Sequence, residues 1–347
     1  MDNLKKFYKN KIILVTGGCG SIGSEIVKKL LDFDVKTIRI YDNNESRLFE
    51  MEQELKTKKI RPLIGDVRDN NRLQRATENV DIIFHAAALK HVPLCEYNPF
   101  EAVKTNILGT ENVISAALQE EIDKLVLIST DKAVNPTNVM GASKLLAEKI
   151  TISANNFKGK KKTSFCSVRF GNVLNSNGSV IPLFKNQIKK GGPVTVTEPD
   201  MTRFFMNIPH AVNLVLKAGF FSKGGETFIL KMPTVKIGDL AKATIEQYAP
   251  EYGYNNSDIE IKIIGKRPGE KMHEELMNDI DAENTYENDE MFISLPSQPK
   301  KTKTKTYILN DETYKESLDF IKTNRTSYSS KNKITLTKKE IKKMLNE

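Results

Sequence analysis

The chain of 347 residues is 39% hydrophobic and 28% charged, which is typical of a globular protein with one large domain or two closely joined ones. Most of its net charge of +9 comes from residues 300–347, which contain 13 Lys and Arg and 6 Asp and Glu. This distribution favours a solvated basic tail over a nucleic-acid-binding surface. The sequence has no long apolar run, no signal-like start and no closely spaced Cys or His, which predicts a cytoplasmic protein without a membrane span, disulfide framework or metal site.

Apolar runs of strand length alternate with helical patterns through the first half of the chain. Six strands are expected, at residues 11–15, 37–41, 62–64, 81–84, 124–128 and 165–169. The segment 24–31, between the first two strands, has apolar residues at helical spacing. Strands that alternate with helices build a parallel sheet through right-handed crossovers, so the sequence predicts a doubly wound, Rossmann-type α/β fold.

The pattern changes after residue 170 into shorter pieces that are punctuated by Gly and Pro. A helix near 209–220 and a strand at 227–230 indicate that residues 208–235 return to the first sheet. We therefore expect three parts: a dinucleotide-binding domain over 1–170, a smaller and discontinuous substrate lobe over most of 171–299, and a basic tail over 300–347.

Two short patterns in the last quarter of the chain carry local predictions. The acidic, polar run 279–290 predicts a loop. Thr337 and Glu340 form a capping-box pattern, and Ile341, Met344 and Leu345 follow on one helical face. The chain is therefore expected to close with a helix.

A glycine-rich turn directly follows the first strand and opens the first helix. Gly17, Gly20 and Gly23 permit a tight turn, a close approach of backbone to a pyrophosphate, and close packing of helix on strand. The helix N-terminus supplies N–H donors and the positive end of the helix dipole to the phosphates. The turn therefore predicts a dinucleotide site, to which Ser21 and Ile22 also belong.

The second strand ends on an acid, Asp42, which lies 22 residues after Gly20. A carboxylate at this place can accept hydrogen bonds from the ribose hydroxyls and would repel a 2′-phosphate, which favours NAD over NADP. Two alternatives stay open: Asp42 could cap the following helix, and Arg47 could serve a phosphate.

Residues after the third and fourth strands complete the cofactor half of the predicted site. Asp66 and Val67 are expected to flank the adenine, and the small Ala86 and Ala87 let the backbone run beside the nicotinamide half. Together with Asn106 in the following helix, these residues resemble the extended short-chain dehydrogenase/reductase superfamily.

Six motifs, in order along the chain, narrow this resemblance. They lie at residues 85–92, 129–133, 169–173, 178–184, 201–204 and 267–271, and together they resemble the UDP-N-acetylglucosamine 4,6-dehydratases of polysaccharide and glycan synthesis. The resemblance runs from about residue 11 to the C-terminus. It adds Lys90 to the expected cofactor contacts and implies a homo-oligomer.

The resemblance implies an internal redox cycle on UDP-N-acetylglucosamine or a related UDP-sugar. A tightly bound NAD or NADP takes hydride from sugar C4, water leaves across C5 and C6, and hydride returns to C6, so the cofactor is recycled. By resemblance, Lys132 is the base at C5, Asp131 is the acid toward the C6 hydroxyl, and Thr130 hydrogen-bonds the sugar hydroxyl region.

Met140 departs from the superfamily pattern. Extended reductases have Tyr four residues before Lys144, where the phenol moves the C4 proton, whereas a methionine cannot. Lys144 keeps its role toward the cofactor ribose, and the acceptor of the C4 proton stays open among Asp131, Lys132 and a water. Two rival functions are a UDP-sugar C4 epimerase, which shares the cofactor domain but normally relies on that Tyr, and a non-catalytic nicotinamide-binding regulator.

The resemblance also assigns contacts to the nucleotide-sugar. Arg267 could bind phosphate through its guanidinium fork, and Glu270 could accept from ribose hydroxyls or orient Arg267. The full set of expected substrate contacts is His91, Asn172, Gly178, Ser179, Val180, Thr195, Arg203, Arg267, Glu270 and Tyr328.

Overall fold

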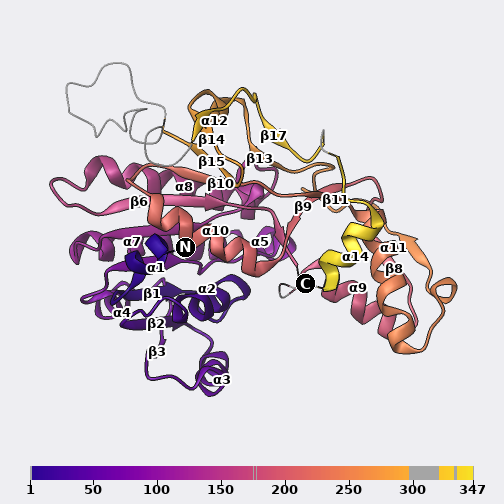
Figure 1. Cartoon of the computed structure of the whole chain (residues 1–347), viewed down its shortest axis with the longest axis horizontal. Helices are drawn as coiled ribbons and strands as arrows, with labels where there is room; N and C mark the ends of the chain where they lie inside the picture. Colours follow the sequence, from indigo (N-terminus) through magenta and orange to yellow (C-terminus); the bar gives the residue numbers. More distant parts are fainter. Residues whose placement is uncertain (1, 175, 177, 297–319, 332–333, 347) are drawn as a thin grey trace.

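The computed structural model describes residues 2–174, 176, 178–296, 320–331 and 334–346, and one large sheet runs through its centre (Figure 1). Its strand order is β16-β14-β15-β10-β6-β5-β4-β1-β2-β3. Neighbours from β10 to β3 are all parallel. These strands are β1 (Ile12–Thr16), β2 (Thr37–Asp42), β3 (Ile60–Ile64), β4 (Ile82–His85), β5 (Lys124–Ile128), β6 (Ser164–Arg169) and β10 (Thr227–Leu230). The predicted doubly wound sheet is confirmed, and each of the six strands predicted in the first half of the chain lies within two residues of its expected place.

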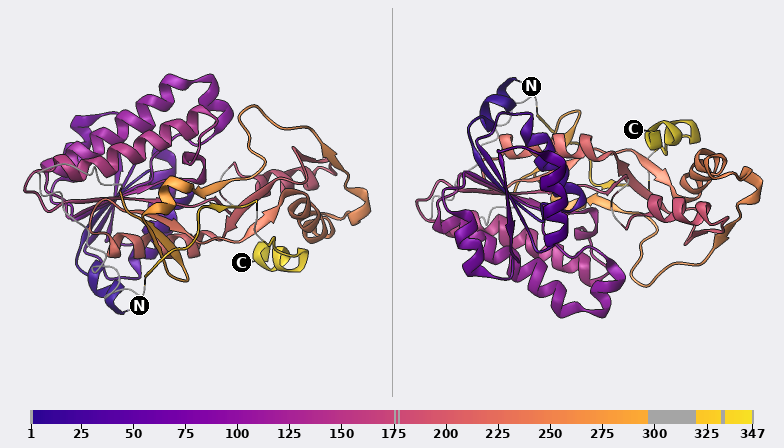
Figure 2. Two further views of the ribbon diagram at one scale, coloured as in Figure 1. Left: turned by 90° about the horizontal axis from the view of Figure 1, so that it is seen from above. Right: turned by 90° about the horizontal axis from the view of Figure 1, so that it is seen from below.

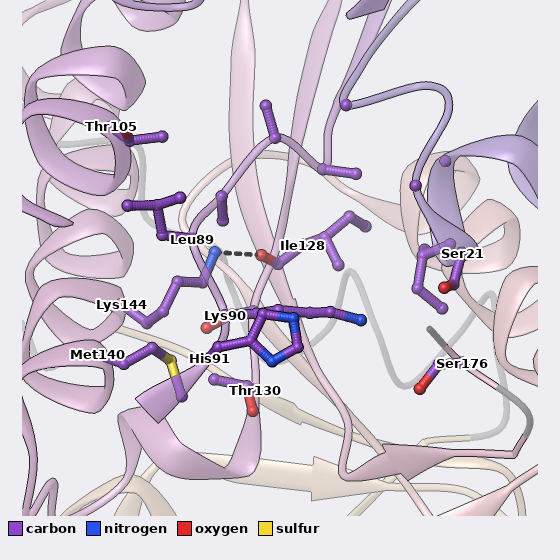
Figure 3. A pocket seen from close by; sticks show the side chains of 18 of the residues that line it. Ser21, Leu89, Lys90, His91, Thr105, Ile128, Thr130, Met140, Lys144 and Ser176 are labelled. Carbon is purple, nitrogen blue, oxygen red and sulfur yellow. Dashed lines mark hydrogen bonds between the residues drawn. The ribbon is translucent and has the colours of Figure 1, made fainter. Parts of the chain in front are cut away.

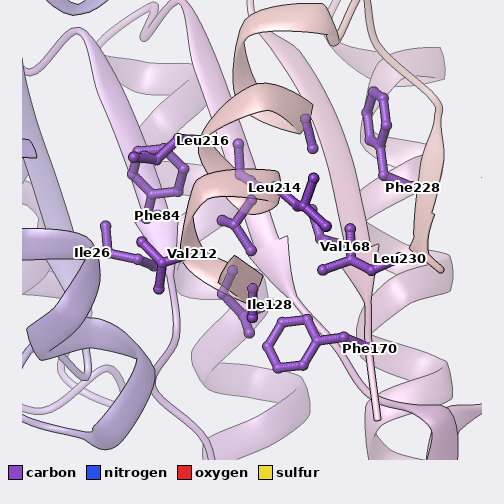
Figure 4. Packing of buried hydrophobic residues seen from close by; sticks show 14 of the residues in the cluster. Ile26, Phe84, Ile128, Val168, Phe170, Val212, Leu214, Leu216, Phe228 and Leu230 are labelled. Carbon is purple, nitrogen blue, oxygen red and sulfur yellow. The ribbon is translucent and has the colours of Figure 1, made fainter. Parts of the chain in front are cut away.

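Helices cover both faces of this sheet (Figure 2). One face carries α1 (Asp2–Tyr8), α2 (Ser21–Leu31), α3 (Glu45–Leu55) and α10 (Ile208–Phe221). The other carries α4 (Asn70–Thr77), α7 (Gly109–Gln119) and α8 (Val139–Phe157). Because the central strands are buried on both sides, they read as continuous apolar runs. Figure 4 shows this packing on the first face, where Phe84 of β4 meets Val212 and Leu216 of α10.

The sheet continues past β10 with antiparallel strands: β15 (Met291–Ser294), β14 (Thr285–Glu287) and β16 (Ile321–Lys322). The prediction of a loop over 279–290 is therefore wrong, because this run holds β14 and the helix α12 (Asp279–Glu283). Two of its acids form ion pairs with residues elsewhere in the chain: Asp281 pairs with the buried Arg169, and Glu287 pairs with Lys231. Tyr286 between them is 4% exposed and packs into the main core.

A smaller lobe with its own apolar core adjoins the sheet (Figure 1). It contains α9 (Val180–Lys189), β8 (Val194–Val196), α11 (Ile237–Tyr248), η3 (Pro250–Tyr252), η4 (Asn256–Asp258), β12 (Ile261–Ile263) and α14 (Lys338–Asn346). The terminal helix α14 confirms the capping-box prediction, because Thr337 and Glu340 bond each other reciprocally and Ile341 is fully buried. Residues 300–319, 332–333 and 347 of the expected basic tail lie outside the described residues.

Two small sheets lie beside the main one and connect it with this lobe. One has the order β11-β9-β7, with bounds Thr234–Lys236, Thr202–Met206 and Asn172–Val173. The other pairs β13 (Glu275–Met277) with β17 (Tyr328–Ser329). Within the part of the chain that is described, no helix combines the length and the apolar character needed to cross a membrane.

Candidate active site

A cavity of about 850 Å³ opens beyond the carboxyl ends of β1, β4, β5 and β6. Strands β1 and β4 are neighbours, and the strand order runs outward from them in opposite directions. Doubly wound sheets bind ligands in the crevice at such a switch point. The cavity has the size of a cofactor or ligand site.

Most of the predicted site residues line this cavity. From the cofactor set these are Gly17, Gly20, Ser21, Ile22, Gly23, Asp42, Asp66, Val67, Ala86, Ala87, Lys90 and Lys144. From the catalytic and substrate sets they are Thr130, Lys132, Met140, His91, Asn172, Gly178, Ser179 and Val180. The fold thus brings together residues from both halves of the sequence.

The glycine turn after β1 leaves room for a ligand at the N-terminus of α2. Gly17 has φ +62, and a Cβ there would lie 2.6 Å from the Ala87 backbone. A Cβ on Gly23 would lie 2.2 Å from the Gly17 carbonyl, so both positions exclude a side chain. Gly20, by contrast, precedes the helix without a side-chain cap and faces only the Gly17 carbonyl, at 3.2 Å. This cradle fits a pyrophosphate.

The Asp42 carboxylate lines the cavity where the adenosine ribose would lie. Its Oδ2 accepts from the Cys19 amide at 2.9 Å and its Oδ1 from the Asn44 amide at 3.0 Å, which fixes its orientation. The N-cap of α3 is Asn44 rather than Asp42, so the capping alternative does not hold. Arg47 pairs with Glu50 and is not among the residues that line the cavity.

Asp66, which follows β3, also lines the cavity. Arg68 donates two side-chain hydrogen bonds to this carboxylate, and these bonds hold its pKa below the usual value. Asp66 is therefore an acceptor-only group over the whole neutral range. Arg68 itself was not predicted, although it lines the cavity next to Val67.

Asn106, which was expected to contact the cofactor, is fully buried and does not line the cavity. Its amide accepts from the Leu89 N–H at 2.8 Å and donates to the Leu89 carbonyl at 3.0 Å. It also donates to the Ser143 hydroxyl at 2.9 Å. The side chain thus joins η1 (Val103–Leu108) to α8 and to the loop that carries Lys90 and His91. Asn106 therefore anchors this loop.

Lys144 and Met140 project from α8 toward the cavity (Figure 3). The Lys144 amine donates to the Ile128 carbonyl at the end of β5, at 2.6 Å. Burial lowers the pKa of this amine to about 8, and Glu148 offsets only part of the effect. Met140 is 3% exposed and packs against Cys95 of α5 (Val92–Tyr97), so it serves as an apolar wall.

A carboxylate and an amine adjoin at the short helix η2 (Asp131–Ala133), directly after β5. Asp131 Oδ1 accepts from the Lys132 amine at 2.9 Å and from the Thr130 hydroxyl at 2.8 Å. Thr130 and Lys132 line the cavity, whereas Asp131 is fully buried behind them. The backbone amide of Asp131 donates to the Phe170 carbonyl at 3.1 Å. The expected direct contact of Asp131 with the sugar is therefore not matched by its position.

The Lys132 amine is held as an ammonium in this arrangement. Burial by itself lowers the pKa of the amine, but the carboxylates of Asp131 and Glu274 outweigh burial and raise that pKa above the ordinary value. Asn172 adds an amide oxygen at 3.4 Å from the amine. A basic role for Lys132 thus requires that it first lose a proton.

Another part of the cavity is formed by His91, Asn172 and residues 178–180 at the start of α9. Gly178 has φ +72, and a Cβ there would lie 2.5 Å from the His91 ring. The absence of a side chain therefore lets the two segments approach each other. This part of the cavity connects to Lys132 through Asn172.

Five predicted substrate residues do not line the cavity. Thr195 is bonded to Gln187 through both its amide and its hydroxyl. Tyr328 is 2% exposed, stacks on Phe204 and bonds the backbone of Met232, so it is part of the core.

The other three, Arg203, Arg267 and Glu270, cluster on the far side of η2. Arg203 is 6% exposed and donates to the carbonyls of Lys271 and Met272. Glu270 accepts from the Arg267 amide and lies 3.5 Å from Arg203, while the Arg267 side chain is exposed.

Several lining residues were missed in the sequence. They are Tyr41, Asn43, Gly65, Arg68, Leu89, Glu101, Thr105, Ile128, Ser129, Phe170, Gly171, Val173 and Ser176. Most directly adjoin a strand end, so the rule that ligands bind at the carboxyl ends of parallel strands could have found them. Glu101 and Thr105 come from α6 (Pro99–Ala102) and η1, and only tertiary packing brings them to the cavity.

The sheet topology, the glycine turn and the cavity at the switch point define a doubly wound, Rossmann-type α/β protein with a ligand site at the carboxyl ends of its strands. Within that class, the family described as polysaccharide biosynthesis protein matches residues 13–296, and the chain belongs to this family.

Curated relatives of the chain carry different names. It is 60% identical over 346 residues to "uncharacterized membrane protein MJ1061" of Methanocaldococcus jannaschii, covering 100% of this chain and 98% of that protein. It is 43% identical to the UDP-N-acetylglucosamine 4,6-dehydratase (inverting) of Campylobacter jejuni, over 84% of each chain. It is 39% identical to a UDP-glucose 4-epimerase of Rickettsia canadensis, over 97% of this chain and 96% of that protein. The chain spans about half the length of the capsular polysaccharide biosynthesis protein CapD of Staphylococcus aureus, covering 47% of it at 52% identity.

Solved structures show the same fold. Pen from Bacillus thuringiensis is similar with a TM-score of 0.88 and 43% identity, over 98% of this chain and 99% of that one. The dTDP-glucose 4,6-dehydratase DesIV from Streptomyces venezuelae, solved with NAD, is similar in fold alone, with a TM-score of 0.66 and 20% identity over 75% of this chain and 86% of that one.

Proposed function

We propose that this protein is a nucleotide-sugar 4,6-dehydratase that converts UDP-N-acetylglucosamine to a UDP-4-keto-6-deoxy-N-acetylhexosamine for surface polysaccharide or glycan synthesis. The observation that carries the proposal is the Lys132 amine, which faces the same cavity as the glycine turn and lies 2.9 Å from a buried carboxylate. Elimination of water next to a ketone needs an acid and a base beside one another. The similar dehydratase of Campylobacter jejuni supports this choice of reaction.

The cavity fits a nicotinamide dinucleotide, and NAD is the proposed form. The cradle at Gly20 would hold the pyrophosphate, and Lys144 with Asp42 would hold the two riboses. NAD is favoured because Asp42 lines the cavity while Arg47 is paired with Glu50 outside the lining. When bound, this group accepts a hydride from sugar C4 and returns it to C6.

The residues around η2 supply the proton chemistry. Thr130 and Lys132 face the cavity, and both donate to Asp131. A proton from the sugar can therefore reach the buried Asp131 through the Thr130 hydroxyl, which removes the need for a Tyr at position 140. Met140 keeps that side of the cavity apolar and helps exclude water.

The nucleotide-sugar would extend from Lys132 past Asn172 to the His91–Gly178 wall. Arg267 remains a proposed phosphate contact, because its side chain is exposed and its loop is anchored at the start of α8. Thr137 and Asn138 at the start of α8 both donate to the Gly269 carbonyl. Configuration at C5 is left open, since the same pair could return a proton to either face of the ring.

The test is mass spectrometry of UDP-N-acetylglucosamine incubated with the purified protein without added reductant. A product lighter by one water supports the proposal. Lys132→Met should abolish that product while leaving cofactor bound, and the exposed Lys338→Met, on the terminal helix, serves as the matched control. A fully active Lys132→Met variant would remove this residue from the chemistry.

The same experiment separates the two rival functions. The relative named UDP-glucose 4-epimerase favours a C4 epimerase as the second candidate, and epimerisation leaves the mass unchanged. Proton nuclear magnetic resonance of the sugar would then show inversion at C4. Cofactor binding without any change in the sugar would favour a non-catalytic regulator.

We also propose that the protein is cytoplasmic and forms a homo-oligomer. Large apolar side chains stand exposed on α5 and α6, with Leu94 at 62%, Tyr97 at 87% and Phe100 at 77% exposure. Neighbouring exposed aromatic side chains of this size commonly mark a contact between protein surfaces. A second copy of this chain is the proposed partner.

A further inference from the structure

A second buried carboxylate lies behind the Lys132 amine, on the side away from the cavity. Glu274 Oε1 is 4.0 Å from Lys132 Nζ and 3.8 Å from Arg203 Nε. The Glu274 side chain is 5% exposed, whereas that of Lys132 is 26% exposed. Lys132 therefore stands between the cavity and Glu274.

The C-terminal strand fixes Glu274 in this place. Its amide donates to the Ser330 hydroxyl at 2.9 Å, and its carbonyl accepts from the Ser330 amide at 2.9 Å. Ser330 also bonds Thr202 of β9, at 2.8 Å between the hydroxyl oxygens. The carboxylate thus reaches Lys132 only because residues far apart in the sequence converge on η2.

The hydrogen bonding of this cluster is incomplete. Among the described residues, neither Glu274 Oε2 nor Asp131 Oδ2 has a hydrogen-bond partner, and both atoms are buried. A buried carboxylate oxygen without a partner costs free energy, so the arrangement is not one that stability alone would favour. Such groups call for a functional explanation.

The charges around the amine alternate in sign. Asp131 from η2 and Glu274, which directly precedes β13, face Lys132 as carboxylates, and Arg203 from β9 opposes them as a cation. Glu274 is in turn faced by Lys132, Arg203 and Lys271, with Asp131 as its like charge. Burial raises the pKa of the Glu274 carboxyl, so its charge is sensitive to the same neighbours.

We propose that Glu274 is a positioning residue for Lys132: with Asp131 it forms a two-carboxylate cradle that holds the amine at the cavity and sets whether that amine carries a proton. This proposal rests on the proposed dehydratase function, because it gives the state of Lys132 a role in the elimination. Loss of the Glu274 charge leaves one carboxylate instead of two beside the amine. The amine then gives up its proton at a lower pH.

The test compares Glu274→Gln with the neighbouring Glu275→Gln, whose carboxylate accepts from Asn135 instead of facing Lys132. When kcat is plotted against pH, one limb of the curve follows the loss of the proton from the Lys132 amine. In Glu274→Gln this limb should move to lower pH by about one unit or more. We expect kcat at the optimum to fall about tenfold or more with KM changed less than about threefold. Glu275→Gln should match the wild type, and Glu274→Asp should restore the position of the limb.

Activity that falls equally at every pH, or a Glu274→Gln variant with wild-type kinetics, would overturn the proposal. A measurement that does not depend on turnover tests the role of Glu274 separately from the proposed function. The rate of acetylation of the Lys132 amine, followed by peptide mass mapping against pH, should also shift to lower pH in Glu274→Gln. If the wild type gives no dehydrated sugar, the proposed function fails, and an unshifted acetylation profile independently defeats the role of Glu274. If Glu274→Gln does not fold, Glu274→Ala takes its place, and a Glu274→Ala profile that lies within about 0.3 pH units of the wild type despite a large loss of kcat would count against the proposal.

Discussion

Replacing Lys144 by Met should stabilise the cofactor-free protein, although Lys144 is assigned to cofactor binding. Burial lowers the pKa of its amine from 10.5 to about 8. At about 1.4 kcal/mol per pKa unit, this shift corresponds to a cost of about 3 kcal/mol for folding at neutral pH. Met has a similar length and no charge, and it loses one hydrogen bond to Ile128, which contributes about 1 kcal/mol. The expected net gain is about 2 kcal/mol.

The sign of the pH dependence follows from the same shift. Between about pH 8 and 10.5 the unfolded chain holds the Lys144 proton and the folded chain does not, so the stability of the wild type rises with pH through this window. The variant has no such rise at this position. Its advantage should therefore be full below about pH 8 and shrink above it.

Urea unfolding followed by circular dichroism, at about pH 7 and about pH 9.5, measures both effects on protein stripped of cofactor. Adding NAD should reverse the order, because the wild type binds it more tightly and gains stability by mass action. A Lys144→Met protein that is less stable at neutral pH, or an advantage that does not change with pH, would refute the electrostatic reasoning.

Three further perturbations test other parts of the site and surface. Asp42→Ala should shift the ratio of dissociation constants about tenfold toward NADP in titration calorimetry, and an unchanged ratio would count against the ribose assignment. Gly17→Ala places a Cβ at φ +62 and 2.6 Å from Ala87, so we expect a loss of about 1–3 kcal/mol in unfolding and loss of bound cofactor by absorbance. The double substitution Tyr97→Ser with Phe100→Ser removes exposed apolar area from the proposed contact between copies. The mass measured by light scattering should then be that of a monomer. A mass equal to that of the wild-type oligomer would show that the contact does not involve these residues.

The parallel sheet could be predicted because its strands are buried on both faces. Ile83 and Val126 are fully buried, and the runs around them are apolar without interruption. The cofactor half of the site followed from the same reasoning, since the glycine turn and Asp42 sit directly at strand ends. Here local sequence and tertiary position agree.

The rest of the site depends on contacts between distant residues. Asp131 is adjacent to Lys132 in sequence, but in the fold it is buried and does not line the cavity. Tyr328 looked like a substrate contact because its polar segment matched a motif, whereas the sheet packs its ring on Phe204. Glu274 gave no local signal, because it reaches Lys132 only after β13 and β17 pair.

The structure of the acidic run 279–290 also could not be predicted from local sequence. Charge density predicted a solvated loop, but the partners of these acids lie elsewhere in the chain. Arg169 of β6 binds Asp281, and Lys231 binds Glu287. Ion pairs between residues so far apart in the sequence cannot be recognised from composition.

The return of hydride to C6, rather than to C4, is the step that separates a dehydratase from both rivals. It can be followed with UDP-N-acetylglucosamine that carries deuterium at C4, incubated with the protein as purified and examined by nuclear magnetic resonance. The proposed reaction predicts that the deuterium appears in the C6 methyl group of a 4-keto sugar. Deuterium that stays at C4, or that is lost without formation of a 6-deoxy sugar, would contradict it.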